Sequence, residues 1–352
     1  MIFPTLDTPC VLVDLDIAEA NIRKYQAHCD SKDLRLRPHI KTHKLPGLAK
    51  YQVAQGAIGI TCQKVSEAEA MIAEGGIDDV LITYNILGDT KTARLRALSG
   101  KVRLSVVADN ETVVDGLSRA FADAATPLTV LVECNTGADR CGVATPAAAA
   151  ELARLIDRLP GLTFGGLMTF PPVGRMEDAE AWLSEAKALI EADGLEVKVV
   201  SSGGSPDMWR AHGTGAVTEH RIGTYVYNDR SLVAHGACTW QDCALTVLAT
   251  VVSVPSPTHA IVDAGSKVLT TDLFGQVGHG HVLGRDDLAI DQLSEEHGRI
   301  VSDGPINLTV GDRLRIVPNH ACVVANMLDK VEGVRGANLT GPMAVAARGQ
   351  VW

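Results

Sequence analysis

The sequence predicts an α/β protein made of a (β/α)8 barrel followed by a mostly antiparallel β domain. Strand-like and helix-like segments alternate from about residue 9 to residue 230, in about eight units. After residue 230, helical periodicity is largely lost, and short β-branched segments are separated by Gly, Pro and Asp turns. We therefore expect a barrel domain at residues 9–230 and a β domain at residues 231–352, which residues 1–8 join.

The first part contains strand patterns separated by amphipathic helices. Strands are expected at residues 9–14, 36–41, 57–63, 79–83, 102–108, 128–133, 163–169, 196–201 and 220–226. Helices are expected at residues 17–29, 46–55, 66–75, 91–98, 111–123, 146–159 and 178–193. A doubly wound sheet is the rival arrangement, but no G-x-G-x-x-G follows the first strand, so the barrel is favoured.

The second part reads as short strands at residues 244–254, 259–263, 299–301, 313–317 and 343–351. Composition narrows the class of protein further. The net charge of -10 argues against nucleic-acid binding through general phosphate attraction. No apolar run is long enough to span a membrane, and no signal peptide is recognisable at the start. Eight scattered cysteines without a C-x-x-C pair indicate a reducing compartment, so we expect a cytoplasmic protein.

The stretch R-P-H-I-K-T-H-K at residues 37–44 is the most informative one. Read with a period of two, it separates Pro38 and Ile40 from Arg37, His39, Lys41 and His43. Four cationic or titratable groups on an inward face are costly unless an anion lies among them. A phosphorylated, carbonyl-bearing cofactor meets that need, and Lys41 is then the Schiff-base lysine. The alternative is a basic strand end at the surface.

Other polar residues follow the predicted strands, where barrel enzymes place their sites. Gln63 ends one strand, and Asn135 to Arg140 follow another. The loop S-S-G-G-S at residues 201–205 offers hydroxyls and backbone N–H groups to a phosphate, and Arg221 to Tyr225 offers a second set. A plain glycine turn is the alternative for the first loop.

In the β domain, His320 and Cys322 lie two residues apart. In a strand or extended loop these two positions face the same way. An imidazole with a thiolate favours Zn²⁺, and other divalent ions are possible. A lone H-x-C is a weak motif, so a structural role stays open.

Several segments together resemble a known family. They occur in the same order as in the metal-activated D-threonine aldolase and D-serine dehydratase family, and they cover nearly the whole chain: Thr8–Cys10, Arg37–Lys44, Gln63–Glu69, Ser202–Ser205, Glu295–Gly298 and Pro318–Cys322. The P-H-x-K-T-H-K block and the late H-x-C are the specific parts. The family has the alanine racemase-like fold, fold type III of pyridoxal phosphate enzymes, and is usually dimeric.

The resemblance implies roles for individual residues. Lys41 carries the pyridoxal 5'-phosphate, with His39 and His43 as further candidate catalytic residues. The candidate cofactor contacts are Gln63, Arg140, Ser202, Gly203, Gly204, Ser205, Gly223, Thr224 and Tyr225. The candidate ligands for a divalent metal (Mn²⁺, Zn²⁺ or Mg²⁺) are His320 and Cys322. The implied substrate is a D-β-hydroxy amino acid, and the implied assembly is a homodimer.

Two reactions of the substrate are compatible with the sequence. Retro-aldol cleavage gives glycine and an aldehyde, and overall likeness favours it. Dehydration gives a 2-oxo acid and ammonia, and Cys322 as a ligand is typical of that branch. Aldolase-like members tend to carry a histidine, as a candidate base, on the strand that corresponds to Gly165 to Phe170, and this chain has none there. An amino-acid racemase and a non-catalytic cofactor carrier are the remaining alternatives.

Overall fold

A computed structural model describes residues 2–213 and 215–352 of the chain. The chain divides into two compact units. The barrel unit comprises Tyr25–Lys41, Pro46–Gly223 and Gln350–Trp352, and the β unit comprises Met1–Lys24, Thr42–Leu45 and Thr224–Gly349. The chain therefore leaves the barrel unit directly after Lys41 and returns to it at Pro46.

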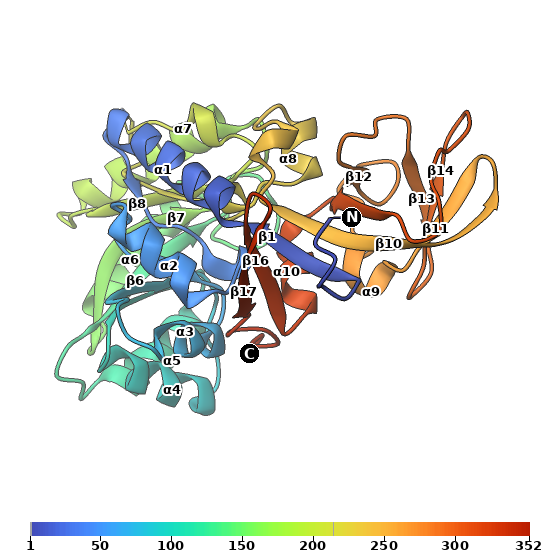
Figure 1. The fold of residues 1–352 in the computed structure, drawn as a ribbon. Coiled ribbons are helices and arrows are strands. Elements are labelled where there is room, and N and C mark those ends of the chain that lie inside the picture. Colours follow the sequence, from blue (N-terminus) through green and yellow to red (C-terminus); the bar gives the residue numbers. More distant parts are fainter. Residues whose placement is uncertain (1, 214) are drawn as a thin grey trace. The chain divides into compact units, whose positions relative to one another are not determined.

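The barrel unit is built on a parallel sheet of eight strands in its described part, in the order β2-β9-β8-β7-β6-β5-β4-β3 (Figure 1). Hydrogen bonds from Thr61 N to Pro38 O (2.8 Å) and from Ile58 N to Leu36 O (2.9 Å) join the two ends. The strands are β2 (Arg35–Leu36), β3 (Ile60–Cys62), β4 (Asp79–Ile82), β5 (Arg103–Ala108), β6 (Leu128–Cys134), β7 (Leu162–Thr169), β8 (Val199–Gly203) and β9 (Glu219–Arg221). This confirms the predicted barrel.

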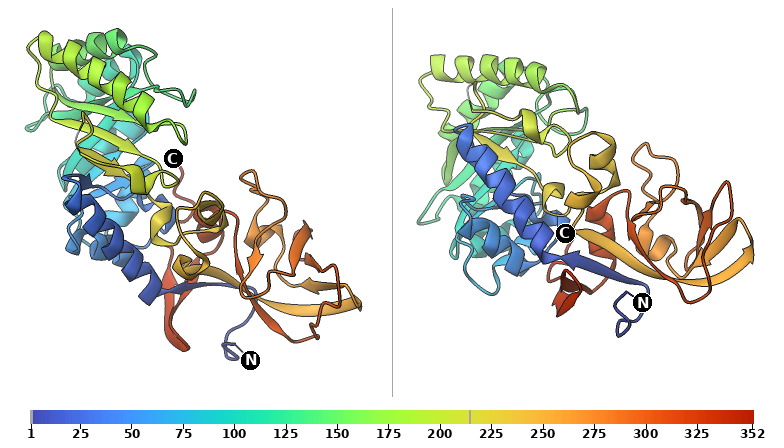
Figure 2. Two further views of the ribbon diagram at one scale, coloured as in Figure 1. Left: turned by 90° about the horizontal axis from the view of Figure 1, so that it is seen from above. Right: turned by 45° about the horizontal axis from the view of Figure 1, so that its top comes forward.

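Helices follow most of these strands. They are α2 (Pro46–Ala54), α3 (Val65–Ile72), α4 (Asp89–Ser99), α5 (Glu111–Phe121), α6 (Pro146–Arg158) and α7 (Met176–Ala192), after α1 (Leu15–Ser31). Helix α6 shows why they form: the Thr145 hydroxyl caps it by accepting from Ala148 N at 3.1 Å, and Pro146 opens its first turn. Helices α6 and α7 pack side by side (Figure 2).

An apolar layer fills the barrel interior. Leu81, Val107, Leu131 and Met168 come from four adjacent strands and form one buried cluster. All four belong to strands and none to a helix, so the cluster lies on the inner face of the sheet, in the interior of the barrel. Side chains two residues further along each strand share this face and lie closer to the carboxyl end of the barrel, where barrel enzymes place their sites.

The β unit contains a sheet of nine strands in the part that is described, most of them antiparallel. The strands are β1 (Cys10–Asp14), β10 (Leu245–Ser256), β11 (His259–Val262), β12 (His281–Val282), β13 (Ala289–Leu293), β14 (Gly298–Val301), β15 (Arg313–Val317), β16 (Lys330–Arg335) and β17 (Asn338–Ala344). The short helices α8 (Arg230–Ala234), α9 (Ser266–Leu269) and α10 (Ala321–Met327) complete it.

The first strand of the chain corrects the sequence-based assignment. We expected residues 9–14 to open the barrel, but β1 pairs antiparallel with β10 and parallel with β16 in the β unit (Figure 1). Val11, Leu12 and Val13 are all buried, because both faces of β1 are covered. A continuous apolar strand fits the interior of either sheet equally well, so its pattern could not assign it.

The described residues form no helix that is long and apolar enough to cross a membrane. No disulfide joins any of the eight cysteines, all of which lie in described parts of the chain.

The stretch at residues 36–41 also departs from the prediction. Strand β2 ends at Leu36, and Ile40–Thr42 form a single 3-10 turn, so the expected six-residue strand is wrong. Arg37 is buried, its Nε donates to Glu219 Oε2 at 2.9 Å, and its Nη1 donates to Asp79. The anion that balances Arg37 is therefore the protein's own pair of carboxylates, which ties β2 to β9 and β4.

We predict that Arg37→Ala lowers the free energy of unfolding by roughly 3–5 kcal/mol, because it leaves buried carboxylates without their cation. Arg103→Ala is the matched control: Arg103 pairs with the same Asp79 at 2.5 Å, but its side chain is 76% exposed. Its loss should cost within about 1 kcal/mol. Urea unfolding measures both, and equal costs would contradict a special role for Arg37.

Candidate active site

Lys41 lies at the end of the barrel strand region, in the 3-10 turn, with an exposed side chain. The turn follows His39, whose backbone N–H donates to Ile222 O at 2.8 Å and so fixes it beside β9. The Nδ1 atom of His39 accepts a long bond (3.4 Å) from the backbone N–H of Lys41. His39 thus helps to hold the turn that presents Lys41.

The second ring nitrogen of His39 meets Gln63. The distance from Nε2 to Gln63 Oε1 is 3.1 Å, and Gln63 Nε2 donates to Thr83 O at 2.7 Å. Because Gln63 uses its amide nitrogen on Thr83, its oxygen accepts from His39, which assigns the proton to Nε2. Burial, and then the charge of Lys41, hold the pKa of His39 well below its usual range, so the imidazole is neutral.

Arg140 lies beyond the end of β6, with more than half of its side chain exposed. Its Nη2 is 3.9 Å from Oε1 of Glu133, and its guanidinium carbon is 4.9 Å from the centroid of the Phe170 ring. Glu133 is buried, and burial raises the pKa of its carboxyl group although the charge of Arg140 opposes this. The pair places one cation and one carboxylate at the barrel mouth.

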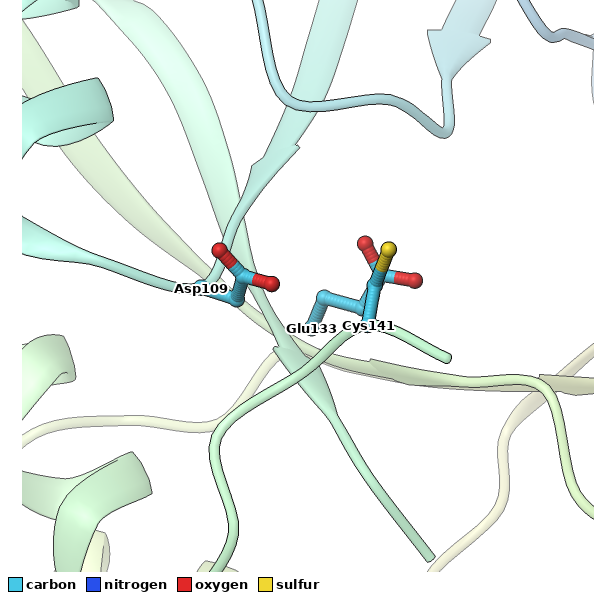
Figure 3. A group of neighbouring side chains, drawn as sticks. All are labelled: Asp109, Glu133 and Cys141. Carbon is cyan, nitrogen blue, oxygen red and sulfur yellow. The ribbon is translucent and has the colours of Figure 1, made fainter. Parts of the chain in front are cut away.

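Sequence reasoning missed Glu133. Figure 3 shows it with Asp109 and Cys141, and ligand atoms of the three lie within 4.8 Å of one another. Asp109 Oδ2 accepts from Gly142 N at 2.9 Å, so this carboxylate fixes the loop that carries Arg140. The sequence did contain a signal for Glu133, because it is a charged residue inside the apolar run L-T-V-L-V-E-C. Period-two alternation places Glu133 on the same face as Leu131.

The predicted phosphate loop begins at the end of β8. Gly203 is needed for packing, because a Cβ there would lie 2.2 Å from Arg221 O. Gly204 has a φ of +144°, and a Cβ on it would meet no atom within 4 Å, so its backbone faces open space. Ser202 borders a cavity of about 180 Å³ together with Arg210 and His220, and Ser205 is buried.

Arg221, at the end of β9, was named only as part of a loop. Its Nε donates to Ser201 Oγ at 2.8 Å and its Nη2 donates to Thr169 O. Burial lowers the pKa of Arg221 to about 10, so it stays protonated at neutral pH. Gly223 ends this part of the barrel unit, whereas Thr224 and the buried Tyr225 belong to the β unit.

In the β unit, the His320-x-Cys322 pair lies at the start of helix α10. The extended geometry that we expected is wrong beyond His320: this residue is the extended N-cap, with a φ of -137°, and Cys322 is already in the helix. The two side chains are still close, since the imidazole of His320 and the thiol of Cys322 are within hydrogen-bonding reach of each other. Burial opposes protonation of His320, but Cys322 and Asp229 outweigh it and raise its pKa to about 10.

Asp229 orients His320 and was also missed from the sequence. Its buried Oδ2 lies 3.0 Å from His320 Nδ1 and accepts from Ala321 N at 3.0 Å. Its Oδ1 accepts from Ser231 Oγ (2.6 Å) and Leu232 N (3.1 Å), which caps helix α8. With Nδ1 held by the carboxylate, Nε2 is left to bind a metal, the usual arrangement at histidine-metal sites.

Hydroxyl groups surround the Cys322 thiol. Its Sγ lies 3.1 Å from Thr42 Oγ1 and 3.5 Å from Thr224 Oγ1. Thr224, predicted as a cofactor contact, is thus placed beside the sulfur within the β unit. His43 is buried, and its Nδ1 accepts from Leu45 N at 3.0 Å, so this ring nitrogen holds a turn.

Comparison with known proteins decides the family. The family model for the alanine racemase N-terminal domain matches residues 13–231, and the model for a putative serine dehydratase domain matches residues 244–334. The 3-hydroxy-D-aspartate aldolase of Paracoccus denitrificans (strain Pd 1222) is 36% identical, over 98% of this chain and 93% of its own. The chain belongs to the D-threonine aldolase and D-serine dehydratase family, with the alanine racemase-like fold.

Both aldolases and dehydratases of this family have structures similar to that of the chain. The crystal structure of a D-threonine aldolase from Filomicrobium marinum superposes with a TM-score of 0.87 at 33% identity, covering 99% of this chain and 97% of that one. A cysteine-to-alanine variant of a D-threo-3-hydroxyaspartate dehydratase, described as the metal-free form, superposes at 0.88 with 28% identity, covering 98% and 99%. The family resemblance inferred from the motifs is confirmed.

The lowered pKa of His39 has a consequence for stability. Below about pH 6.5 the unfolded chain takes up a proton on this residue that the folded chain does not, so stability falls as the pH falls. We predict that wild type loses up to about 1.4 kcal/mol per pH unit more than His39→Asn between pH 6.5 and pH 5. Urea unfolding along this pH range measures both slopes, and parallel slopes would refute the prediction.

Proposed function

We propose that this chain is a lyase, dependent on pyridoxal phosphate and a divalent metal, that cleaves D-β-hydroxy-α-amino acids to glycine and an aldehyde. The match to an aldolase over 98% of the chain is the observation that carries the aldolase assignment. The same proposal includes a homodimer in the cytoplasm, both of which rest on the resemblance and on cysteine usage.

The barrel unit fits the cofactor. Lys41 is exposed at the carboxyl end of the barrel, where barrel enzymes place their reactive groups, and a lysine amine can form a Schiff base with a carbonyl group. Arg140 brings a largely exposed guanidinium group to the same end, which suits the phenolic oxygen of the cofactor. The open space beside Gly204 suits the close approach of a phosphate to the backbone. Bound there, pyridoxal phosphate would withdraw the electron pair left on the substrate's α-carbon.

The β unit fits a divalent cation. His320 Nε2 and Cys322 Sγ are the two donors we assign, with Asp229 orienting the first and Thr42 placed beside the second. Nitrogen and sulfur donors favour Zn²⁺, while Mn²⁺ and Mg²⁺ stay possible. Such a cation would polarise the β-hydroxyl of the substrate as a Lewis acid.

The reaction then depends on whether a residue of the chain removes the β-hydroxyl proton or the α-proton of the substrate. Removal of the β-hydroxyl proton breaks the Cα–Cβ bond and releases an aldehyde and glycine. Strand β7 supplies no histidine for this step, since Met168 and Thr169 end it and the Thr169 hydroxyl donates to Cys134 O. His39 is the barrel-unit imidazole that we propose for it, through Nδ1, because Nε2 carries the proton donated to Gln63 and the contact of Nδ1 with Lys41 N is long, at 3.4 Å.

Dehydration is the second candidate, and Cys322 favours it. If Lys41 removes the α-proton instead, the β-hydroxyl leaves, and hydrolysis yields a 2-oxo acid and ammonia. The similarity of this chain to a D-threo-3-hydroxyaspartate dehydratase over nearly its whole length supports this candidate.

The first test of the cofactor site is Lys41→Ala. This variant should lose the absorption band at roughly 410–420 nm that a Schiff base on lysine gives, and essentially all turnover. Lys44→Ala is the control, because Lys44 lies three residues away and its Nζ donates to Asn326 Oδ1 at 2.7 Å. It should keep the band. A Lys41→Ala protein that stays yellow and active would refute the assignment.

Product analysis separates the two reactions. The protein is mixed with pyridoxal phosphate, Mn²⁺ or Zn²⁺, and D-threonine, and its products are assayed in parallel. We expect glycine and acetaldehyde in equal amounts. 2-Oxobutanoate with ammonia would replace the aldolase by the dehydratase. L-allothreonine alone, the α-epimer of D-threonine, would point to a racemase and contradict both.

A further inference from the structure

One buried hydroxyl group in the β unit, that of Tyr227, makes no hydrogen bond to any described residue. Tyr227 is completely buried, yet its Oη has no hydrogen-bond partner among the described residues. The backbone of Tyr227 is fixed, because its N–H donates to Thr224 O at 3.0 Å and its carbonyl accepts from Ala244 N at 2.7 Å. Its ring meets His43 edge-on, with centroids 6.4 Å apart. The hydroxyl is therefore held in place and cannot turn toward solvent.

Tyr227 is connected through Thr224 to one proposed metal ligand, Cys322: the Tyr227 N–H donates to Thr224 O at 3.0 Å, and Thr224 Oγ1 lies 3.5 Å from Cys322 Sγ. The charge of Cys322 acts on Tyr227 and, after burial, is the second cause of its raised pKa. No hydrogen bond joins the two groups. The same short segment provides Thr224, whose Oγ1 is 3.5 Å from Cys322 Sγ, and Asp229, which holds His320.

We propose that Tyr227 is a third polar group of the cation site, and that its hydroxyl donates a hydrogen bond to an oxygen ligand of the ion. This inference rests on the proposed function, because it takes His320 and Cys322 as metal ligands. The oxygen belongs to water in the resting protein and to the β-hydroxyl of the substrate during turnover.

Three physical points support an oxygen ligand as the missing partner. A buried hydroxyl without a partner is destabilising, so such groups are rare in folded proteins. Two protein ligands leave a tetrahedral cation with open positions that water or substrate fills. Partners outside the ligand shell commonly change metal affinity when they are removed, as an oriented donor to a bound oxygen would.

The test is Tyr227→Phe, which removes one oxygen atom and keeps the ring. Full-length protein loaded with pyridoxal phosphate is titrated with Co²⁺, and binding is followed by equilibrium dialysis and visible absorption. We expect affinity for Co²⁺ to fall about 10- to 100-fold. The visible cobalt bands should shift, whereas the thiolate-to-cobalt band should remain because Cys322 still binds. In the protein without added metal, the variant should have a higher melting temperature, since the unpaired hydroxyl is gone.

Tyr25→Phe is the matched control. It also removes a buried phenol oxygen, but that oxygen donates to Met208 O at 2.9 Å and contacts His220 Nδ1 at 2.8 Å within the barrel unit. This variant should melt at a lower temperature and bind Co²⁺ like wild type.

Two outcomes would overturn the inference. Unchanged Co²⁺ affinity in Tyr227→Phe would show that the hydroxyl serves only a buried water, and loss of the thiolate-to-cobalt band would show that it acts on the sulfur itself. His320→Ala separates this failure from that of the proposed function. If His320→Ala also binds Co²⁺ normally, the cation site itself is wrongly assigned.

Discussion

The ion pair between Arg37 and Glu219 is the interaction on which the barrel unit depends. Arg37 joins Asp79 on β4 to Glu219 on β9, and Glu219 Oε1 in turn accepts from Ser201 Oγ at 2.6 Å. Ser201 accepts from Arg221, which reaches Thr169 O on β7. One continuous hydrogen-bonded chain therefore runs through the barrel from Asp79 on β4 to Thr169 on β7. Because its charges are buried and paired, breaking any link leaves a costly uncompensated group.

At each candidate site a histidine ring is oriented by a hydrogen bond from one of its nitrogens to a neighbouring side chain. In the barrel unit, Gln63 Oε1 accepts a hydrogen bond from His39 Nε2, and burial keeps the ring neutral. In the β unit, the buried carboxylate of Asp229 takes the Nδ1 side of His320, and the opposite nitrogen is left for a ligand. A neutral amide leaves the ring of His39 uncharged before it acts as a base, and a carboxylate suits a ring that supports a cation.

The choice between aldol cleavage and dehydration is narrow in chemical terms. Both begin from the same D-β-hydroxy-α-amino acid and differ only in whether the first proton leaves the β-hydroxyl or the α-carbon. Strand β7 ends without a histidine, and Thr169 uses its hydroxyl within the protein. The choice therefore lies with the groups around Lys41 and with the oxygen environment of the cation, where His39 and Tyr227 are the residues that we single out.

The sequence by itself determined the barrel, the β domain and the family, and it singled out Lys41, His320 and Cys322 as the reactive residues that we propose. These follow from period-two and helical patterns and from motifs in which the reactive groups are neighbours in the chain. It could not assign β1 to its sheet, because an apolar strand buried on both faces fits either one. Only the tertiary structure identified Glu133, Asp229 and Tyr227. Their partners lie far away in the chain, and a buried carboxylate or hydroxyl acquires its role from the groups that folding brings beside it.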